Sequence, residues 1–274
     1  MTMTITCFAD EISSELTEQL DVLAEVGVSH LEIRNVWGKN VLALTDEELS
    51  RISAMLKERG FRVSSIGSPI GKYPITEPFE AQLTAMDRAV AAAKKLETAY
   101  IRIFSYFIPE GEDRNILLKE ALDRMKQLAQ TAEKNGVVLI LENDSGLFGT
   151  TPEECVEIFN HCDSSSLCAA FDAGNYVIEG VKPMDEAYPK ISPYLEYVHV
   201  KDATKEPRLF VPAGKGEGQL EELLLALNEK NFTGFLSVEP HLAKYLPDAT
   251  NPERVKTAIQ ALQGILDKHQ IAWQ

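Results

Sequence analysis

Four short apolar stretches of the sequence each end in a side chain that can bind a metal ion. In chain order these residues are Glu142, Asp172, His199 and Glu239, separated by 30, 27 and 40 residues. Three carboxylates and one imidazole form an oxygen-rich ligand set that suits Mn²⁺, Mg²⁺ or Co²⁺, with Zn²⁺ as a further candidate. A single glutamate at the end of a strand is usually a solvated loop residue. Four such residues at matching positions instead favour one divalent metal site.

The stretch before Glu142 indicates how these residues are positioned. Residues 137–141 are all apolar; Gly136 precedes them and the polar residues 143–146 follow. An apolar run of this length between turn residues indicates a strand buried on both faces, as in a parallel sheet covered by helices. Glu142 is therefore expected where a buried strand meets a loop.

Predicted strands and helices alternate along the whole chain. The predicted strands cover residues 4–9, 28–34, 61–66, 99–104, 137–141, 167–171, 195–200 and 235–238. The predicted helices cover residues 13–26, 45–59, 78–96, 115–135, 151–162, a short segment near Asp185, 220–230 and a closing segment from 251. Ser13 or Ser14 is expected to cap the first helix. The connection after residue 200, about 15 residues long, is long enough for a lid or a binding loop.

Eight strand–helix units in 274 residues predict an α/β fold, with a single (β/α)8 TIM barrel domain spanning residues 1–274. An open doubly wound sheet is the alternative. Such a sheet usually begins with a glycine-rich loop after its first strand, and residues 8–11 contain no glycine. In a barrel the reactive groups lie at the C-terminal ends of the strands, which is where the four predicted ligands fall.

Composition narrows the classes of partner. The net charge of −15 argues against a nucleic-acid-binding protein, which needs basic patches to contact phosphates. The four cysteines form no C-x-x-C pair and are expected to be free thiols of a reducing compartment. The sequence shows no secretory signal and no apolar run long enough for a membrane span, so a cytoplasmic location and no membrane partner are expected. A homo-oligomer is compatible with the sequence.

Several motifs resemble those of the xylose isomerase-like barrel superfamily, in particular its sugar phosphate isomerase/epimerase group. They are Leu141-Glu142-Asn143, Phe171-Asp172-Ala173-Gly174-Asn175, Val198-His199-Val200-Lys201-Asp202, Gly214-Lys215-Gly216-Glu217-Gly218 and Ser237-Val238-Glu239-Pro240. The resemblance implies a TIM barrel in which Glu142, Asp172, His199 and Glu239 bind one divalent metal. Apurinic endonucleases of this superfamily add several histidines for a three-zinc cluster. This chain has five histidines in all, which disfavours a nuclease. It carries Asn175 where those enzymes, and several sugar epimerases of the superfamily, have histidine.

The resemblance also implies a reaction and a pair of catalytic residues. Glu142 and Glu239 would remove and return a proton beside a carbonyl group, through an enediolate that the metal stabilises. Five further residues are candidates for binding a small carbohydrate-like substrate: Glu32, Lys72, Arg102, Lys201 and His241. Each has an ordinary alternative as a structural or solvated side chain.

The sequence and the resemblance together leave three hypotheses for the function. The first is a metal-dependent isomerase or epimerase acting on a sugar or a related hydroxy-carbonyl compound. The second is a metal-dependent dehydratase or lyase acting on an inosose- or dehydroshikimate-like substrate, which differs in that a hydroxide leaves. The third is a barrel that binds sugars without catalysis. The product mass separates the first two, because only dehydration loses water.

Overall fold

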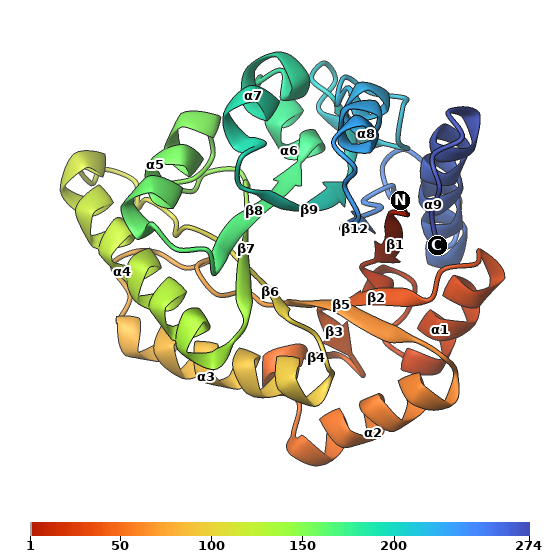
Figure 1. Cartoon of the computed structure of the whole chain (residues 1–274), viewed down its shortest axis with the longest axis horizontal. Helices are drawn as coiled ribbons and strands as arrows, with labels where there is room; N and C mark the ends of the chain where they lie inside the picture. Colours follow the sequence, from red (N-terminus) through yellow and green to blue (C-terminus); the bar gives the residue numbers. More distant parts are fainter. Residues whose placement is uncertain (1) are drawn as a thin grey trace.

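A computed structural model describes residues 2–274 of the chain (Figure 1). Its central strands are β1 (Thr4–Cys7), β2 (His30–Ile33), β5 (Arg62–Gly67), β6 (Tyr100–Ile103), β7 (Val138–Glu142), β8 (Leu167–Asp172), β9 (Leu195–Val200) and β12 (Phe235–Val238). They form one eight-stranded sheet in the order β1-β12-β9-β8-β7-β6-β5-β2, with every pair parallel. A parallel bridge between Phe8 and Glu32 brings the outer strands β1 and β2 together. The sheet is thus a nearly closed α/β TIM barrel, and the predicted fold class is confirmed.

Helices surround this barrel, as Figure 1 shows. They are α1 (Leu16–Glu25), α2 (Asp46–Glu58), α3 (Phe79–Lys95), α4 (Arg114–Asn135), α5 (Pro152–Cys162), α6 (Ala173–Ile178), α7 (Tyr188–Ile191), α8 (Leu220–Glu229) and α9 (Asn251–Lys268), with short turns η1 (Ala9–Glu11), η2 (Val41–Ala43) and η3 (Pro183–Ala187). Capping boxes begin α2, α5 and α9, because Thr45, Thr151 and Thr250 each bond a glutamate three residues later. Gly136 ends α4 in the left-handed conformation.

The structure differs from the predicted elements in four places. The first helix begins at Leu16 with Glu15 at its N-cap, so the predicted cap at Ser13 or Ser14 is wrong; the Ser13 hydroxyl instead accepts the Glu15 N–H. Helix α6 follows β8 directly and was not predicted. The connection after β9 contains a hairpin of β10 (Asp202–Thr204) and β11 (Leu209–Val211), and a smaller hairpin of β3 (Asn35–Val36) and β4 (Lys39–Asn40) follows β2.

Side chains alternate between the inside of the barrel and the helical layer. Ile140, Ala170 and Tyr197 form a small buried cluster of their own, whereas their neighbours along the strands, such as Leu139 and Val198, belong to the large core between strands and helices. Because successive strand residues point to opposite faces, the residue two positions beyond each member of the inner cluster also points inward. Those residues are Glu142, Asp172 and His199.

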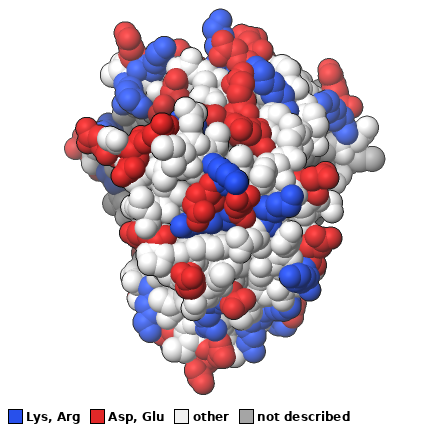
Figure 2. All heavy atoms as spheres, turned by 90° about the vertical axis from the view of Figure 1, so that its left-hand side faces the viewer, with Lys and Arg blue, Asp and Glu red and all other residues white. Residues whose placement is uncertain are grey.

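Two other features of the described residues bear on partners. No helix within residues 2–274 is both long and apolar enough to cross a bilayer. On the side of the barrel drawn in Figure 2, acidic and basic side chains are interspersed.

All four cysteines are free thiols, as predicted.

Candidate active site

Three of the predicted ligands meet inside the C-terminal end of the barrel. Glu142, Asp172 and His199 each offer a ligand atom, and these atoms lie within 4.8 Å of one another. All three side chains are buried, and they come from the neighbouring strands β7, β8 and β9. Two carboxylates and one imidazole at this spacing can hold a divalent cation.

His199 lies between two carboxylates. Its Nδ1 is 3.4 Å from Glu142 Oε1, and its Nε2 is 3.3 Å from Glu32 Oε2. Neither nitrogen has a hydrogen bond of good geometry to any group within residues 2–274. Buried polar atoms are normally paired, so these atoms fit ligands that a cation would satisfy.

Lys201 connects Asp172 with the fourth predicted ligand, Glu239. The ammonium Nζ lies 2.9 Å from Asp172 Oδ2 and 2.5 Å from Glu239 Oε2, and all three side chains are buried. A positive charge therefore lies between two of the four predicted ligands. The ammonium neutralises both carboxylates, so a metal ion that used both of them would have to displace it.

Each of the two predicted catalytic glutamates is held by an arginine through one oxygen. Arg102 Nη1 donates to Glu142 Oε2 at 2.7 Å, and Arg34 Nη1 donates to Glu239 Oε1 at 3.0 Å. The other oxygens face inward, because Glu142 Oε1 lies near His199 and Glu239 Oε2 contacts Lys201. The arginines thereby fix both carboxylates and leave the second oxygen of each turned toward the interior of the site.

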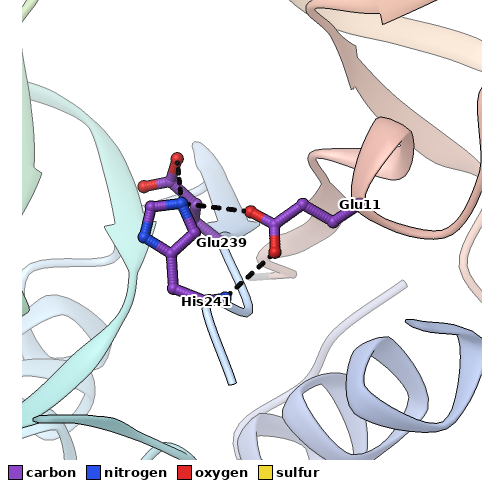
Figure 3. A group of neighbouring side chains, drawn as sticks. All are labelled: Glu11, Glu239 and His241. Atoms are coloured by element: carbon purple, nitrogen blue, oxygen red, sulfur yellow. Dashed lines mark hydrogen bonds and ion pairs between the residues drawn. The ribbon is translucent and has the colours of Figure 1, made fainter. Parts of the chain in front are cut away.

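Glu239 also belongs to a second group of potential metal ligands, with Glu11 and His241 (Figure 3). His241 Nε2 lies 3.3 Å from Glu239 Oε1 and 3.2 Å from Glu11 Oε1, and the His241 backbone N–H donates to Glu11 Oε2. Glu11 comes from η1 after β1, whereas Glu239 and His241 follow β12, so the contact joins the two neighbouring loops. In this structure the four predicted ligands thus divide between two groups linked by Lys201.

A cavity of about 440 Å³ opens above these residues. Four of the predicted substrate-binding residues line it: Lys72, Arg102, Lys201 and His241. Both Glu142 and Glu239 also line it, whereas Asp172 and His199 are fully buried beneath. Lys72 pairs with Asp144 at the rim, at 2.6 Å. A cavity of this size with convergent polar groups is typical of a small-molecule site.

The fifth predicted substrate-binding residue, Glu32, lies deeper in the barrel. Its carboxylate is buried, does not line the cavity, and accepts hydrogen bonds from Tyr197 Oη at 3.0 Å and Ser237 Oγ at 2.8 Å. It therefore supports His199 from the barrel interior. A carboxylate that holds a ligating imidazole fixes the orientation of its ring.

Burial and neighbouring charges set the protonation of the buried groups. Burial disfavours charge on Glu142, but His199 and Arg102 outweigh that effect and hold its pKa well below the ordinary value. Burial likewise opposes protonation of His199, yet the Glu142 and Glu32 carboxylates raise the His199 pKa to about 10. For Asp172 burial prevails and raises the pKa to about 6, with Lys201 opposing the rise. Glu142 is thus ionised at neutral pH and His199 is cationic in this structure.

Loop residues next to the ligands hold them in place. The Asn143 amide bonds both the carbonyl and the N–H of Asp172 at 2.9 Å, and Asn175 N–H donates to Asp172 Oδ1 at 2.8 Å. The Asn175 amide also donates to the Asn143 carbonyl, so β7 and β8 are tied together at their ends.

Asp202 organises the loop that follows β9. Its carboxylate accepts backbone N–H bonds from Gly214 at 2.9 Å, Gly216 at 2.9 Å and Gly218 at 2.8 Å. A Cβ on Gly216 would lie 2.4 Å from the Ala203 carbonyl oxygen, so only glycine fits there. This glycine-rich segment therefore binds a carboxylate of the protein itself and fixes the chain next to Lys201.

Several residues of the site were not predicted. Arg34 was not among the predicted site residues, although it continues the period-two series His30, Glu32, Arg34 at the second strand. Glu11 lies in the loop after β1, and a carboxylate at the end of a barrel strand is a signal that could have indicated it. The position of Asn175 was noticed only for lacking a histidine.

Comparison with known proteins agrees with this architecture. The sequence profile of the xylose isomerase-like TIM barrel family matches residues 20–265. The chain belongs to this family. Among xylose isomerase-like relatives, inosose dehydratase of Clostridium perfringens is 25% identical over 167 residues, which are 55% of this chain and 54% of that protein. The chain thus spans about half the length of this curated relative.

Solved xylose isomerase-like structures show the same fold at low sequence identity. The probable 3-DHS dehydratase AsbF of Bacillus anthracis has a TM-score of 0.78 at 16% identity, covering 96% of this chain and 99% of that one. The IOLI protein, solved with a zinc atom, has a TM-score of 0.77 at 20% identity (97% and 99% covered). A D-tagatose 3-epimerase-like protein has a TM-score of 0.75 at 18% identity (97% and 100% covered). Relatives with this fold thus include proteins named as dehydratases and epimerases, and one that binds zinc.

Proposed function

We propose that this protein is a divalent-metal-dependent isomerase or epimerase of a sugar-like hydroxy-carbonyl compound. The observation that carries the proposal is the group formed by Glu142, Asp172 and His199, whose ligand atoms lie within 4.8 Å of one another below a cavity of about 440 Å³. Glu239 completes the ligand set once Lys201 yields its place between Glu239 and Asp172. The relative with zinc and the epimerase-like neighbour support this reading.

In this proposal Glu142 and Glu239 move the proton. Both glutamates line the cavity, come from strands that are not neighbours in the sheet, and each uses one oxygen to bind an arginine. The second oxygens, Glu142 Oε1 beside His199 and Glu239 Oε2 beside Lys201, would approach a bound substrate from different directions, so one can remove a proton from carbon and the other can return it. The low pKa of both carboxyls keeps them ionised and able to accept a proton.

The metal would polarise the carbonyl and hydroxyl oxygens of the substrate and so acidify the C–H bond between them. Cationic groups of the chain add to this field. Arg102 and Lys201 line the same cavity and can hold an oxygen that gains negative charge, while Asn175 donates toward Glu142 at 3.4 Å. His241 borders Glu239 and is placed to bind a substrate hydroxyl.

A dehydratase is the second candidate, because the relative from C. perfringens is named inosose dehydratase and AsbF is named a probable 3-DHS dehydratase. Both reactions begin with removal of a proton next to a carbonyl, so the same residues serve either. They differ in whether a β-hydroxyl leaves.

One experiment tests the proposal. Purified protein with Mn²⁺ is incubated in D₂O with a panel of ketoses, inososes and 3-dehydroshikimate, and products are followed by mass spectrometry and NMR. Isomerisation gives a product with one carbon-bound deuterium and no loss of water; dehydration gives a product lighter by one water. Metal-loaded protein that exchanges no carbon-bound proton in any of these compounds would refute both enzymatic readings and favour a binding protein.

A further inference from the structure

A second cavity, of about 450 Å³, adjoins the site cavity. We call it the apolar annex. Its walls include six apolar side chains from α6, the β11 strand, the segment after β12 and α9: Ile178, Leu209, Phe210, Leu242, Ala243 and Val255. The site cavity is lined mainly by charged and amide side chains. The two neighbouring cavities therefore suit different chemical groups.

Phe210 and His241 line both cavities and form the partition between them. Their ring centroids lie 5.4 Å apart with the planes tilted by 59°. On the site side, Lys201 Nζ lies 5.2 Å from the centroid of the Phe210 ring, and His241 Nε2 lies 3.3 Å from Glu239 Oε1. A molecule held next to Glu239 and Lys201 would therefore lie beside the same two rings that line the annex.

We propose that the apolar annex binds an aromatic substituent of the substrate, so that the substrate is a sugar-like compound carrying an aromatic group. This inference rests on the proposed function, because it assumes that the reacting carbons lie beside Glu142 and Glu239. The substituent would pack against Leu209, Phe210 and Val255 and displace water from apolar surface, which is favourable in proportion to the area covered.

Charge at the annex favours an aromatic over an aliphatic group. Three cationic side chains and one carboxylate line the same cavity as the apolar walls: Arg208, Lys244, Arg254 and Glu11. Arg208 and Lys244 are exposed, and Arg208 lies 3.5 Å from Glu179. Cations attract the negative face of an aromatic ring, and the Phe210 and His241 rings offer edge and face contacts. An aliphatic chain would gain only from the apolar surface. The hairpin β10–β11 supplies Leu209 and Phe210, so the element that follows Lys201 also shapes the annex.

A matched pair of unreactive ligands tests the annex. Phenyl β-D-glucopyranoside and methyl β-D-glucopyranoside share the sugar and differ only in the aromatic ring, and neither has a free carbonyl to react. Their dissociation constants are measured by NMR titration of the full-length protein with Mg²⁺, for the wild type, Ala243→Trp and Ala91→Trp. Ala243→Trp adds bulk at a residue that lines the annex. Ala91→Trp adds the same bulk at an exposed position of α3 and is the control.

The expected result is that the phenyl glycoside binds at least about tenfold more tightly than the methyl glycoside to the wild type and to Ala91→Trp. In Ala243→Trp this ratio falls to about one. Leu209→Asn, which makes the same wall polar without adding bulk, gives a second reading where Ala243→Trp lowers the yield of folded protein. Three outcomes would overturn the proposal that the annex binds an aromatic substituent. They are equal affinities of the two glycosides for the wild type, no binding of the phenyl glycoside, and an affinity ratio that is unchanged in both annex variants.

The experiments distinguish failure of the annex proposal from failure of the proposed enzymatic function. Proton exchange on small ketoses without a phenyl preference removes the annex and leaves the enzyme. Tighter binding of the phenyl glycoside without any proton exchange would support a barrel that binds aromatic glycosides and would refute the enzymatic function.

Discussion

Lys201 Nζ lies 2.9 Å from Asp172 Oδ2, and the same ammonium contacts Glu239 Oε2. Lysine is thus the cation that neutralises two of the four proposed metal ligands. The burial of all three groups makes this ion pair strong and costly to break. A divalent cation that takes both carboxylates has to displace this ammonium, so metal binding and the position of Lys201 are coupled.

The first prediction concerns that coupling. Lys201→Gln should bind Mn²⁺ at least about tenfold more tightly than the wild type, because the competing positive charge is gone. The metal-free variant should at the same time lose about 3 kcal/mol or more in free energy of unfolding, since two buried carboxylates lose their partner. Calorimetric titration and urea denaturation measure the two effects.

Lys57→Gln is the matched control, because its ammonium pairs with the exposed Glu97 and lines a different cavity. It should change neither quantity measurably. Weaker metal binding in Lys201→Gln than in the control would show that Lys201 supports the metal and does not compete with it.

The second prediction concerns the metal itself. Elemental analysis of the purified protein should find about one divalent metal per chain, as a single site of this type requires. His199→Ala should lose it, whereas His161→Ala, whose imidazole lies 3.4 Å from Asp123 away from the site, should retain it. Three metals per chain, or full occupancy in His199→Ala, would refute the proposed ligand set.

The third prediction concerns the two glutamates. Glu142→Gln and Glu239→Gln keep the shape and one oxygen of each side chain but cannot take up a proton. Each should retain measurable metal and lose turnover by at least about 10²-fold, the contribution expected from a positioned base. Exchange of solvent deuterium into bound substrate should persist in at most one of the two. Normal turnover in both variants with metal bound would assign the proton transfer elsewhere, with Lys201 and His241 next.

The fourth prediction concerns pH. In the metal-free protein the neighbouring carboxylates raise the His199 pKa to about 10, above its ordinary value of about 6.5. The protonated form therefore stabilises the fold fully below about pH 6.5, and this contribution is lost as the pH rises through 10. The free energy of unfolding of chelator-treated protein should fall by about 3.5 kcal/mol between pH 6.5 and pH 9.5. His199→Gln should show a smaller fall, and an identical fall in both proteins would contradict the prediction.

Metal binding should also release protons. A ligating imidazole must be neutral, so at pH 7.5 the cationic His199 has to lose its proton when the ion enters. Calorimetry in buffers with different ionisation enthalpies counts these protons, and about one per metal is expected. A value near zero would show that His199 is already neutral in the metal-free protein.

The fifth prediction concerns the loop held by Asp202. Asp202→Ala removes a buried carboxylate that accepts three glycine N–H bonds and should lower the free energy of unfolding by about 3 kcal/mol. It should also weaken substrate binding, because the loop begins next to Lys201. Asp113→Ala, which removes an exposed helix cap, should cost only about 1 kcal/mol. Equal losses would show that the glycine loop does not depend on Asp202.

The local elements of the barrel could be predicted from the sequence because they follow from short-range signals. The apolar run before Glu142 forms β7, and the helices predicted to start at Thr45 and Thr151 begin there, each with the threonine as its N-cap. Side-chain alternation placed the polar residues at the strand ends on the inner face. The cap at Ser13 or Ser14 was wrong because Ser13 bonds the Glu15 backbone in a turn before the helix. The β10–β11 hairpin has short strands without a clear alternating pattern, so it could not be seen.

The sequence by itself therefore determined the barrel and the order in which potential ligands arrive at its mouth. Only the tertiary structure decided which groups meet. Residues separated by 205 positions, Arg34 and Glu239, form a bond because β2 and β12 face the same barrel interior. Lys201 lies between Asp172 and Glu239, and Glu32 lies below His199, for the same reason. Ion pairs between strands depend on the distances between side chains in the folded barrel, and the spacing of residues along the sequence does not define those distances.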